Sequence, residues 1–190
     1  MISLCLFVFN LAPVSGSAGF VFTNNYPATE LLGNIYIAEV VYSPWLYNQI
    51  WFGVAGNFGY KRSKPYDNEY LQDSGLSITC NSIGLGPQIT CQFSDIFEIG
   101  LSMSFNYMML SYPESGANSV VVTRSDNRWR FGTHFYSTFS PVSVGHFHFG
   151  IQAGIYINGT GGNTYYGSST RPFENFGVYG LSLQIQIARS

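Results

Sequence analysis

Charged side chains are scarce in this sequence. Lysine, arginine, aspartate and glutamate together make up 9% of the 190 residues, whereas an average soluble domain carries about 25%. The net charge of −2 has no basic cluster behind it, which argues against nucleic acid as a partner. Hydrophobic residues nevertheless reach 46% and aromatic residues 17%. The chain is therefore apolar enough to build one sizeable domain, but it has too few charges to cover such a domain in water.

Cysteine is also rare. The three cysteines, Cys5, Cys80 and Cys91, form no CxxC motif and have no histidine or cysteine cluster around them. Cys80 and Cys91 lie on what we predict to be a single strand, about 35 Å apart at the usual strand rise. A disulfide scaffold and a zinc site are therefore both unsupported, and we expect neither a metal nor another cofactor.

Long apolar runs are missing, and alternation takes their place. No stretch reaches the roughly 20 apolar residues that a transmembrane helix needs. From Phe97 to Met109, however, every second residue is large and apolar, and small or polar residues such as Ser102 stand between them. Successive side chains of a strand point to opposite sides, so this period predicts a two-faced strand. Seven segments show the pattern, at 34–42, 50–60, 83–93, 97–109, 129–139, 147–157 and 179–187.

The connections between these segments alternate in length. Tight turns are expected near 43–49, 94–96 and 140–142, with the chain reversing at Ser43-Pro44-Trp45, Ser94-Asp95 and Ser140-Pro141. Long polar links fall near 62–76, 111–127 and 158–175. Short turns at one end and long loops at the other are typical of up-and-down antiparallel outer-membrane barrels, whose short turns face the periplasm and whose long loops face outward.

The position of the charges indicates which face of the strands lies inside. A soluble barrel of the lipocalin kind would bury the apolar stripe, whereas a membrane barrel turns that stripe toward lipid. Most charged residues lie in or beside the predicted loops, and those inside strands, Glu39, Glu98 and Arg130, share the polar face. A charge on a lipid face is costly, so this distribution favours the membrane barrel. Trp and Tyr favour the lipid–water interfaces, and two lipid-facing aromatic girdles are predicted, from Tyr42, Trp45, Phe93, Phe97 and Phe139 at the short-turn end and Tyr60, Phe105, Tyr107 and Trp129 at the loop end.

With this pattern of strands and turns the chain resembles the small eight-stranded outer-membrane barrels of Gram-negative bacteria, the OmpA/OmpX-like group. The resemblance covers essentially the whole length and rests on pattern rather than on a residue motif. It implies an outer-membrane location and a monomer in contact with the bilayer and with lipopolysaccharide. It further implies delivery by the barrel-assembly machinery.

The first strand is left open by the sequence. We expect one domain over residues 1–190, and an even strand number requires a strand before residue 34. Residues 2–12 are one choice for it. Alternatively, the apolar run 4–12 followed by Gly16-Ser17-Ala18 looks like a signal-peptide core and cleavage site. In that case residues 1–18 are a signal-like segment, and residues 19–23 supply a shortened strand.

Any chemistry is expected among the inward polar residues. Projected from the turn at Ser140-Pro141, His134 lies opposite His148 and Tyr136 opposite His146, while Gln92 faces Glu98. Such a set could bind zinc or perform acid–base work, but we favour an internal polar plug, since side chains just fill an eight-stranded barrel and buried polar groups need partners. The predicted lumen network is Glu39, Gln88, Gln92, Glu98, Arg130, His134, Tyr136, His146, His148, Gln152 and Gln184.

Three functions follow from this arrangement. The first is a structural or surface-interaction role without catalysis, in which the long loops contact an extracellular partner and Tyr165, Tyr166, Arg171 and Phe173 form a candidate recognition loop. The second is a narrow pore for small solutes or ions, because inward glycines could leave water-filled gaps. The third is a lipid A-modifying membrane enzyme, a hydrolase or acyltransferase. That chemistry needs a serine paired with a histidine, whereas Ser137 is predicted to face outward and His134 inward.

Overall fold

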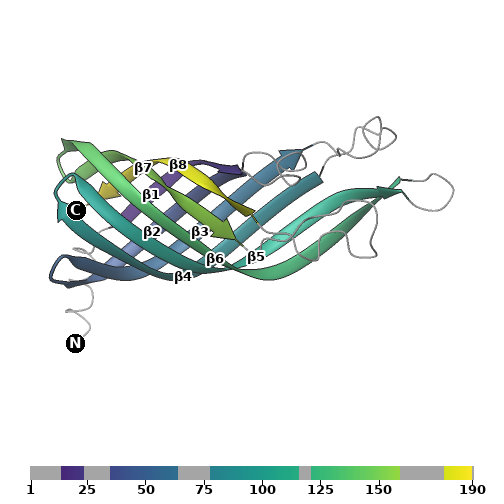
Figure 1. Ribbon diagram of the computed structural model, residues 1–190, viewed down its shortest axis with the longest axis horizontal. Helices are drawn as coiled ribbons and strands as arrows, with labels where there is room; N and C mark the ends of the chain where they lie inside the picture. The colour runs from purple at the N-terminus through teal and green to yellow at the C-terminus, as the bar shows by residue number, and fades with distance from the viewer. Residues whose placement is uncertain (1–13, 24–34, 64–77, 116–120, 159–177, 190) are drawn as a thin grey trace.

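The computed structural model describes residues 14–23, 35–63, 78–115, 121–158 and 178–189. They form eight antiparallel strands, each paired with its neighbours in sequence, and β1 also pairs with β8, so the sheet closes into a barrel (Figure 1). The predicted eight-stranded up-and-down barrel is confirmed. Within these ranges, no helix is long and apolar enough to span a membrane. The strands are β1 (Val14–Thr23), β2 (Ile35–Tyr47), β3 (Ile50–Ser63), β4 (Ile78–Ser94), β5 (Phe97–Ser115), β6 (Val121–Val144), β7 (Phe147–Asn158) and β8 (Val178–Arg189).

The two ends of the barrel differ. Two-residue turns join β2 to β3, β4 to β5 and β6 to β7 at one end, which we call the turn end. At the other, the loop end, the β5–β6 hairpin projects beyond the remaining strands (Figure 1). The pairing of β6 with β7 begins at Gly132, opposite Asn158. Within the described residues, the part of β6 at 121–131 therefore pairs with β5 alone.

The alternating stripes point as predicted for a membrane barrel. On β5, Met103 and Phe105 are exposed on the outer wall, whereas Ser102, Ser104 and Asn106 are buried in the lumen. Of the predicted girdle residues, Trp45, Phe93, Phe97 and Phe139 at the turn end and Tyr60, Phe105 and Trp129 at the loop end are exposed, while Tyr42 and Tyr107 are half-buried. The ring centroids of Tyr107 and Trp129 lie 5.2 Å apart. The large apolar surface is thus on the outside, the reverse of a soluble barrel.

The lumen is layered along its axis. Polar side chains fill its middle, whereas nearest the loop end a layer of apolar side chains lies beside the buried Ser82 and Asn158, an arrangement that the sequence patterns did not indicate. Its members are Val21, Ile35, Ile37, Cys80, Met108 and Leu110, all buried. The pairs Val21–Ile35 and Cys80–Leu110 are direct neighbours across strands. We call this group the apolar lumen layer.

Two of the predicted turns are wrong in position. Pro44 and Pro141 do not end their strands but lie at register shifts, between Tyr42 and Trp45 on β2 and between Phe139 and Val142 on β6. A bulge tolerates proline because the ladder hydrogen bond is already interrupted there. The strands continue past the prolines, and the chain reverses at residues 48–49 and 145–146 instead.

Positive backbone φ angles explain why the chain reverses at those later positions. Asn48 has φ 54° and Gly145 has φ 61°, and tight hairpin turns require this conformation, which glycine and asparagine adopt most readily. The third turn, at residues 95–96, comes one residue after the predicted Ser94-Asp95. The turns at 48–49 and 95–96 thus lie at the late end of the predicted links 43–49 and 94–96, whereas the turn at 145–146 lies beyond the predicted 140–142.

We expect Gly145→Ala to lower the free energy of unfolding by about 1 kcal/mol, because an L-residue is strained in the left-handed region. A Cβ there would meet no atom within 4 Å, so the backbone alone sets the cost. Urea titrations in detergent micelles measure the change. Asn48→Gly is the matched control and should be neutral or slightly stabilising, and equal losses for the two variants would contradict the explanation.

The first strand, β1, spans Val14–Thr23. It therefore contains both residues 19–23 and the Gly16-Ser17-Ala18 segment, and it forms register pairs with β2 and with β8. Residues 2–12, the other proposed location of a strand, lie outside the described ranges. Cys80 and Cys91 both lie on β4, as predicted, and they form no disulfide with one another.

Candidate functional site

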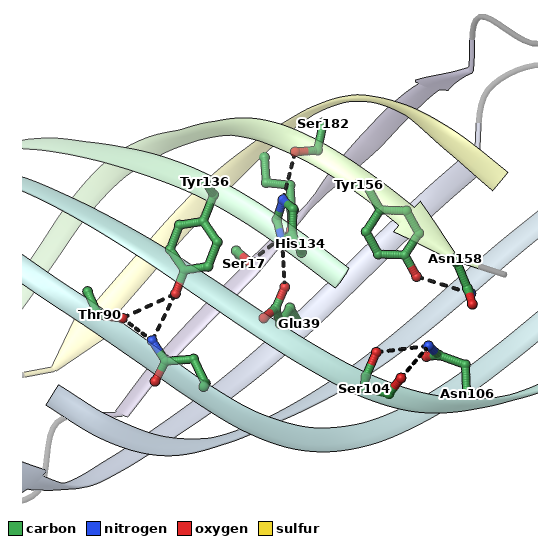
Figure 2. Close-up of polar contacts among 12 residues, drawn as sticks. Ser17, Glu39, Thr90, Ser104, Asn106, His134, Tyr136, Tyr156, Asn158 and Ser182 are labelled. Atoms are coloured by element: carbon green, nitrogen blue, oxygen red, sulfur yellow. Dashed lines mark hydrogen bonds and ion pairs between the residues drawn. The ribbon is translucent and has the colours of Figure 1, made fainter. Parts of the chain in front are cut away.

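A chain of three buried polar residues crosses the centre of the lumen. Glu39 on β2, His134 on β6 and Ser182 on β8 each point inward because they occupy the polar face of their strands (Figure 2). The Glu39 Oε2 atom lies 2.9 Å from His134 Nδ1, and Ser182 Oγ lies 2.7 Å from His134 Nε2. The exposed fractions of the three residues are 2–3%. We call this group the central relay.

Two tyrosines hold the imidazole of the central relay in place. The Tyr136 ring lies 5.1 Å from the His134 ring, centroid to centroid, and the Tyr156 ring lies 5.8 Å from it in an edge-on arrangement. In Figure 2 the two tyrosines stand on either side of His134. Asn158 donates a hydrogen bond of 3.3 Å to the Tyr156 hydroxyl. The histidine is thus fixed from four directions, by two hydrogen-bond partners and two aromatic rings.

A second cluster lies between the central relay and the turn end. Ser43 donates to Gln88 Oε1 over 2.9 Å, and the amide of Gln88 donates to the hydroxyls of Thr90 and Tyr136. All four residues are largely buried. Tyr136 pairs across the strands with Gly100, and its ring lies directly over that glycine. We call this cluster the lumen roof, because it separates the centre of the barrel from the space nearer the turn end.

Below the lumen roof is a cavity of about 220 Å³ at the turn end. Its walls include Trp51, Gln92, Glu98, Tyr136 and His148. Gln186 donates to Glu98 Oε1 over 3.1 Å, and the Trp51 indole N–H points at Gln92 Oε1 at 3.4 Å. As predicted, Gln92 and Glu98 face one another across β4 and β5.

The histidine pairing expected from the sequence is wrong. His134 pairs with Tyr156 and Tyr136 with Gly154, while His148 pairs with Ser143. His146 lies in the turn and is exposed, so it is not part of the lumen. The error follows from the position of the turn, because moving the reversal from 140–141 to 145–146 shifts every partner on β7.

The remaining predicted lumen residues separate into groups. Glu39, His134, Gln88 and Tyr136 belong to the central relay and the lumen roof, whereas Glu98, Gln92 and His148 lie at the turn-end cavity. Ser17 on β1 donates a hydrogen bond of 2.8 Å to Gln184. Gln152 is buried between Thr138 and Gln184, its cross-strand neighbours.

Arg130 is half-buried and pairs with Asn106 on β5. Tyr165, Tyr166, Arg171 and Phe173 lie outside the described residues.

Sequence reasoning did not single out Ser182, Asn106, Tyr156 or Asn158. The alternation did place the first three of them on the polar faces of their strands, and this was the available signal. Ser182 could be recognised as the partner of His134 only once the barrel was closed, since the two residues lie 48 positions apart in the chain.

The connectivity of the central relay is that of a serine–histidine–carboxylate triad, in which the histidine takes the serine proton. Such a nucleophile must also reach a substrate carbonyl beside a set of oxyanion donors. Ser182 is buried in the lumen wall, and its neighbour on β1 is the fully buried Val21. No group of three or more His, Cys, Asp or Glu side chains suited to a metal ion occurs among the residues that the structure describes.

Comparisons with known proteins bear on the fold. Neither a family model nor a curated protein matches the sequence. Among solved structures, Ail, the attachment invasion locus protein of Yersinia pestis, in complex with the heparin analogue sucrose octasulfate, is similar with a TM-score of 0.50 and 11% identity over 93% of this chain and 96% of that one. The Neisserial surface protein A matches with a TM-score of 0.42 and 13% identity over 94% of each chain. The resemblance to the small outer-membrane barrels is therefore confirmed at the level of the fold.

Proposed function

We propose that this chain, which has the fold of the small eight-stranded outer-membrane barrels, resides in a bacterial outer membrane and acts at the cell surface. Its apolar wall contacts the bilayer and the lipid chains of lipopolysaccharide, and its lumen is a packed plug. Support for the membrane placement comes from the outer wall, where residues such as Leu85, Phe105 and Ile185 are more than 60% exposed. A wall of this kind in water would be a strong aggregation hazard.

The closed lumen is the observation that carries the proposal. Going from the loop end to the turn end, a solute would meet the apolar lumen layer, then the central relay and then the lumen roof. An ion would have to lose water at the first of these layers and separate the His134–Glu39 pair at the second. Eight strands leave an interior that side chains just fill, and the buried side chains between the loop end and the lumen roof support the same arrangement here.

The glycines of the lumen argue against the pore alternative. A Cβ at Gly84 would collide with the Asn106 side chain, and one at Gly100 would collide with the Tyr136 ring. A Cβ at Gly150 would collide with the Ser140 side chain. Neighbouring side chains therefore occupy the space that these glycines leave, and water-filled gaps are not needed to explain them.

The enzyme alternative has one observation in its favour, the connectivity of the central relay. Against it stands the burial of Ser182, which denies an acyl substrate access to the hydroxyl. Ser137, the outward serine considered from the sequence, contacts the backbone oxygen of Ala153 instead of a histidine. We therefore assign the relay a structural role. Turnover of labelled lipid A that is abolished by Ser182→Ala would overturn this assignment.

The surface role is supported by the projecting β5–β6 hairpin. Among the described residues, its β6 part at 121–131 has register partners on β5 only and extends past the strands beside it, and binding residues are often carried by elements that a rigid scaffold holds out from its surface. An extracellular partner that contacts the loop end fits this geometry. The lumen would then serve only to hold the barrel rigid beneath that surface.

Planar-bilayer recordings test the proposal. The wild-type protein should give no discrete openings, and the double variant Met108→Ala/Leu110→Ala should also be silent, because the central relay and the lumen roof still close the lumen beyond the layer that this variant thins. Met103→Ala is the control, since Met103 lies on the outer wall of the same strand. Heat-modifiable migration verifies that each variant is folded. Steady openings of the wild-type protein would refute the plug and favour the pore.

A further inference from the structure

At the turn end of the barrel, exposed apolar side chains continue along the strands as far as the turns. We call Trp45, Leu46, Tyr47, Ile96, Val142, Val144 and Phe147 the turn rim. Tyr47 is 70% exposed, Val144 64% and Leu46 53%. Asp95 is the only Asp, Glu, Lys or Arg within 43–50, 93–97 and 141–148. Apolar side chains gathered in this way at the surface of a protein in water are unusual, so this rim needs a cover.

We propose that the turn rim is immersed in the interfacial layer of the periplasmic leaflet, where phospholipid headgroups and the first part of their acyl chains cover it. The inference rests on the proposed membrane placement and adds the depth to which the barrel sits. Its first support is continuity with the lipid-facing wall. Trp45 pairs with Phe52, and Val142 pairs with Phe149 on β7, so the outer apolar face runs along the strands up to the turns.

The distribution of the turn rim around the barrel favours a bilayer over a protein partner. The β2–β3 turn contributes Leu46 and Tyr47, the β4–β5 turn contributes Ile96, and the β6–β7 turn contributes Val144. In the closed order of strands, these turns stand at three positions around the circumference. A protein that docks from one side would require an apolar patch on that side only, whereas a bilayer surrounds the barrel and contacts all three turns alike.

The residue types fit the interface. Trp and Tyr are enriched where hydrocarbon meets water, because their rings are apolar and their N–H or O–H groups remain hydrated. Asn48, Gln49 and His146, which occupy the turns themselves, are polar and exposed and can bond to headgroups. The turn-end cavity, whose wall includes Ile96, would then open toward headgroups rather than bulk periplasm.

Cysteine accessibility in lipid nanodiscs tests the inference, because both leaflets are open to reagent and no periplasmic protein is present. The native cysteines are replaced (Cys5→Ser, Cys80→Ala, Cys91→Ser), and Tyr47→Cys and Val144→Cys are introduced separately, so that one misfolded variant does not end the test. A charged, membrane-impermeant maleimide is the probe, and heat-modifiable migration verifies folding. We expect both positions to react several-fold more slowly than Thr123→Cys, an exposed position on the projecting β6.

A fourth variant, Phe135→Cys, separates the two levels of the proposal. Phe135 lies on the outer wall at mid-strand and is exposed in the structure, so lipid should protect it wherever the turns sit. If Phe135→Cys is protected while both turn positions react as fast as Thr123→Cys, the turn rim faces water and the inference is overturned, with a periplasmic partner as the cover to consider. If Phe135→Cys also reacts fast, the membrane placement itself fails.

Discussion

Replacing His134 with alanine is expected to lower the free energy of unfolding by about 3–5 kcal/mol, the usual cost of leaving one member of a buried ion pair without its partner. The carboxylate of Glu39 would remain buried and would lose its contact at 2.9 Å. Ser182 would lose its hydrogen-bond partner on the imidazole at the same time. Urea titrations of the barrel in detergent micelles, followed by heat-modifiable migration and circular dichroism, measure the change.

The matched control is His148→Ala. That imidazole lies at the turn end, where Ser143 Oγ is 2.9 Å from its Nδ1 in an exposed setting, and its loss should change stability by no more than about 0.5 kcal/mol. A double variant, Glu39→Leu/His134→Leu, removes both partners of the pair and should recover much of the loss, because an apolar pair of similar size leaves neither partner buried alone. Equal effects of His134→Ala and His148→Ala would contradict the structural role of the central relay.

Gly100→Ala is expected to lower the free energy of unfolding by about 1–3 kcal/mol, as overpacking does. A Cβ at Gly100 would occupy the position of the Tyr136 ring. The ring is held in place, because its hydroxyl is bonded to Gln88 over 3.1 Å and the ring lies 5.1 Å from that of His134, centroid to centroid. Moving the ring would therefore disturb both the lumen roof and the central relay.

Gly16→Ala tests this explanation by making the same substitution on an open face. The nearest atom to a Cβ there is the backbone oxygen of Glu39 at 4.0 Å, so the added methyl fits on the outer wall without collision. Its stability should be unchanged within about 0.5 kcal/mol, and urea titration under identical conditions compares the two variants. If Gly16→Ala were as destabilising as Gly100→Ala, a general loss of glycine flexibility would explain both effects and the packing argument would fail.

Much of the fold could be predicted because each strand carries its own signal. The period of two along segments such as 97–109 gives the inner and outer faces without knowledge of any neighbour, and the scarcity of charge on the outer face gives the environment. The three tight turns also show which strands are paired in three of the hairpins. For this reason the facing pair Gln92 and Glu98 could be named in advance, although even there the turn was placed one residue early.

The candidate site was harder to predict, for two physical reasons. Pro44 and Pro141 are ordinary signals for a turn, but a bulge accepts proline as well, and one shifted reversal changes every cross-strand partner that follows it. The central relay, moreover, joins residues that are not neighbours on adjacent strands. Glu39 and His134 are 95 positions apart and meet across the lumen, so their contact depends on the closure and stagger of the whole barrel. Alternation tells which side chains point inward but not which of them meet.

The seam between β1 and β8 has a consequence for how the barrel forms. It joins the first and last described strands, and its lumen bond between Ser17 and Gln184 spans 167 positions of the chain. Contacts so distant in sequence are made slowly, because the entropy of closing the loop is lost before any contact repays it. Glu39 on β2 and His134 on β6 meet across the lumen, so the contact that completes the central relay forms only when the barrel closes. Before closure, the polar faces of the strands have no lumen to enclose them and would be exposed to the hydrocarbon of the bilayer. The same bilayer is the environment that the apolar faces need, so the open sheet must be kept out of it until the barrel closes.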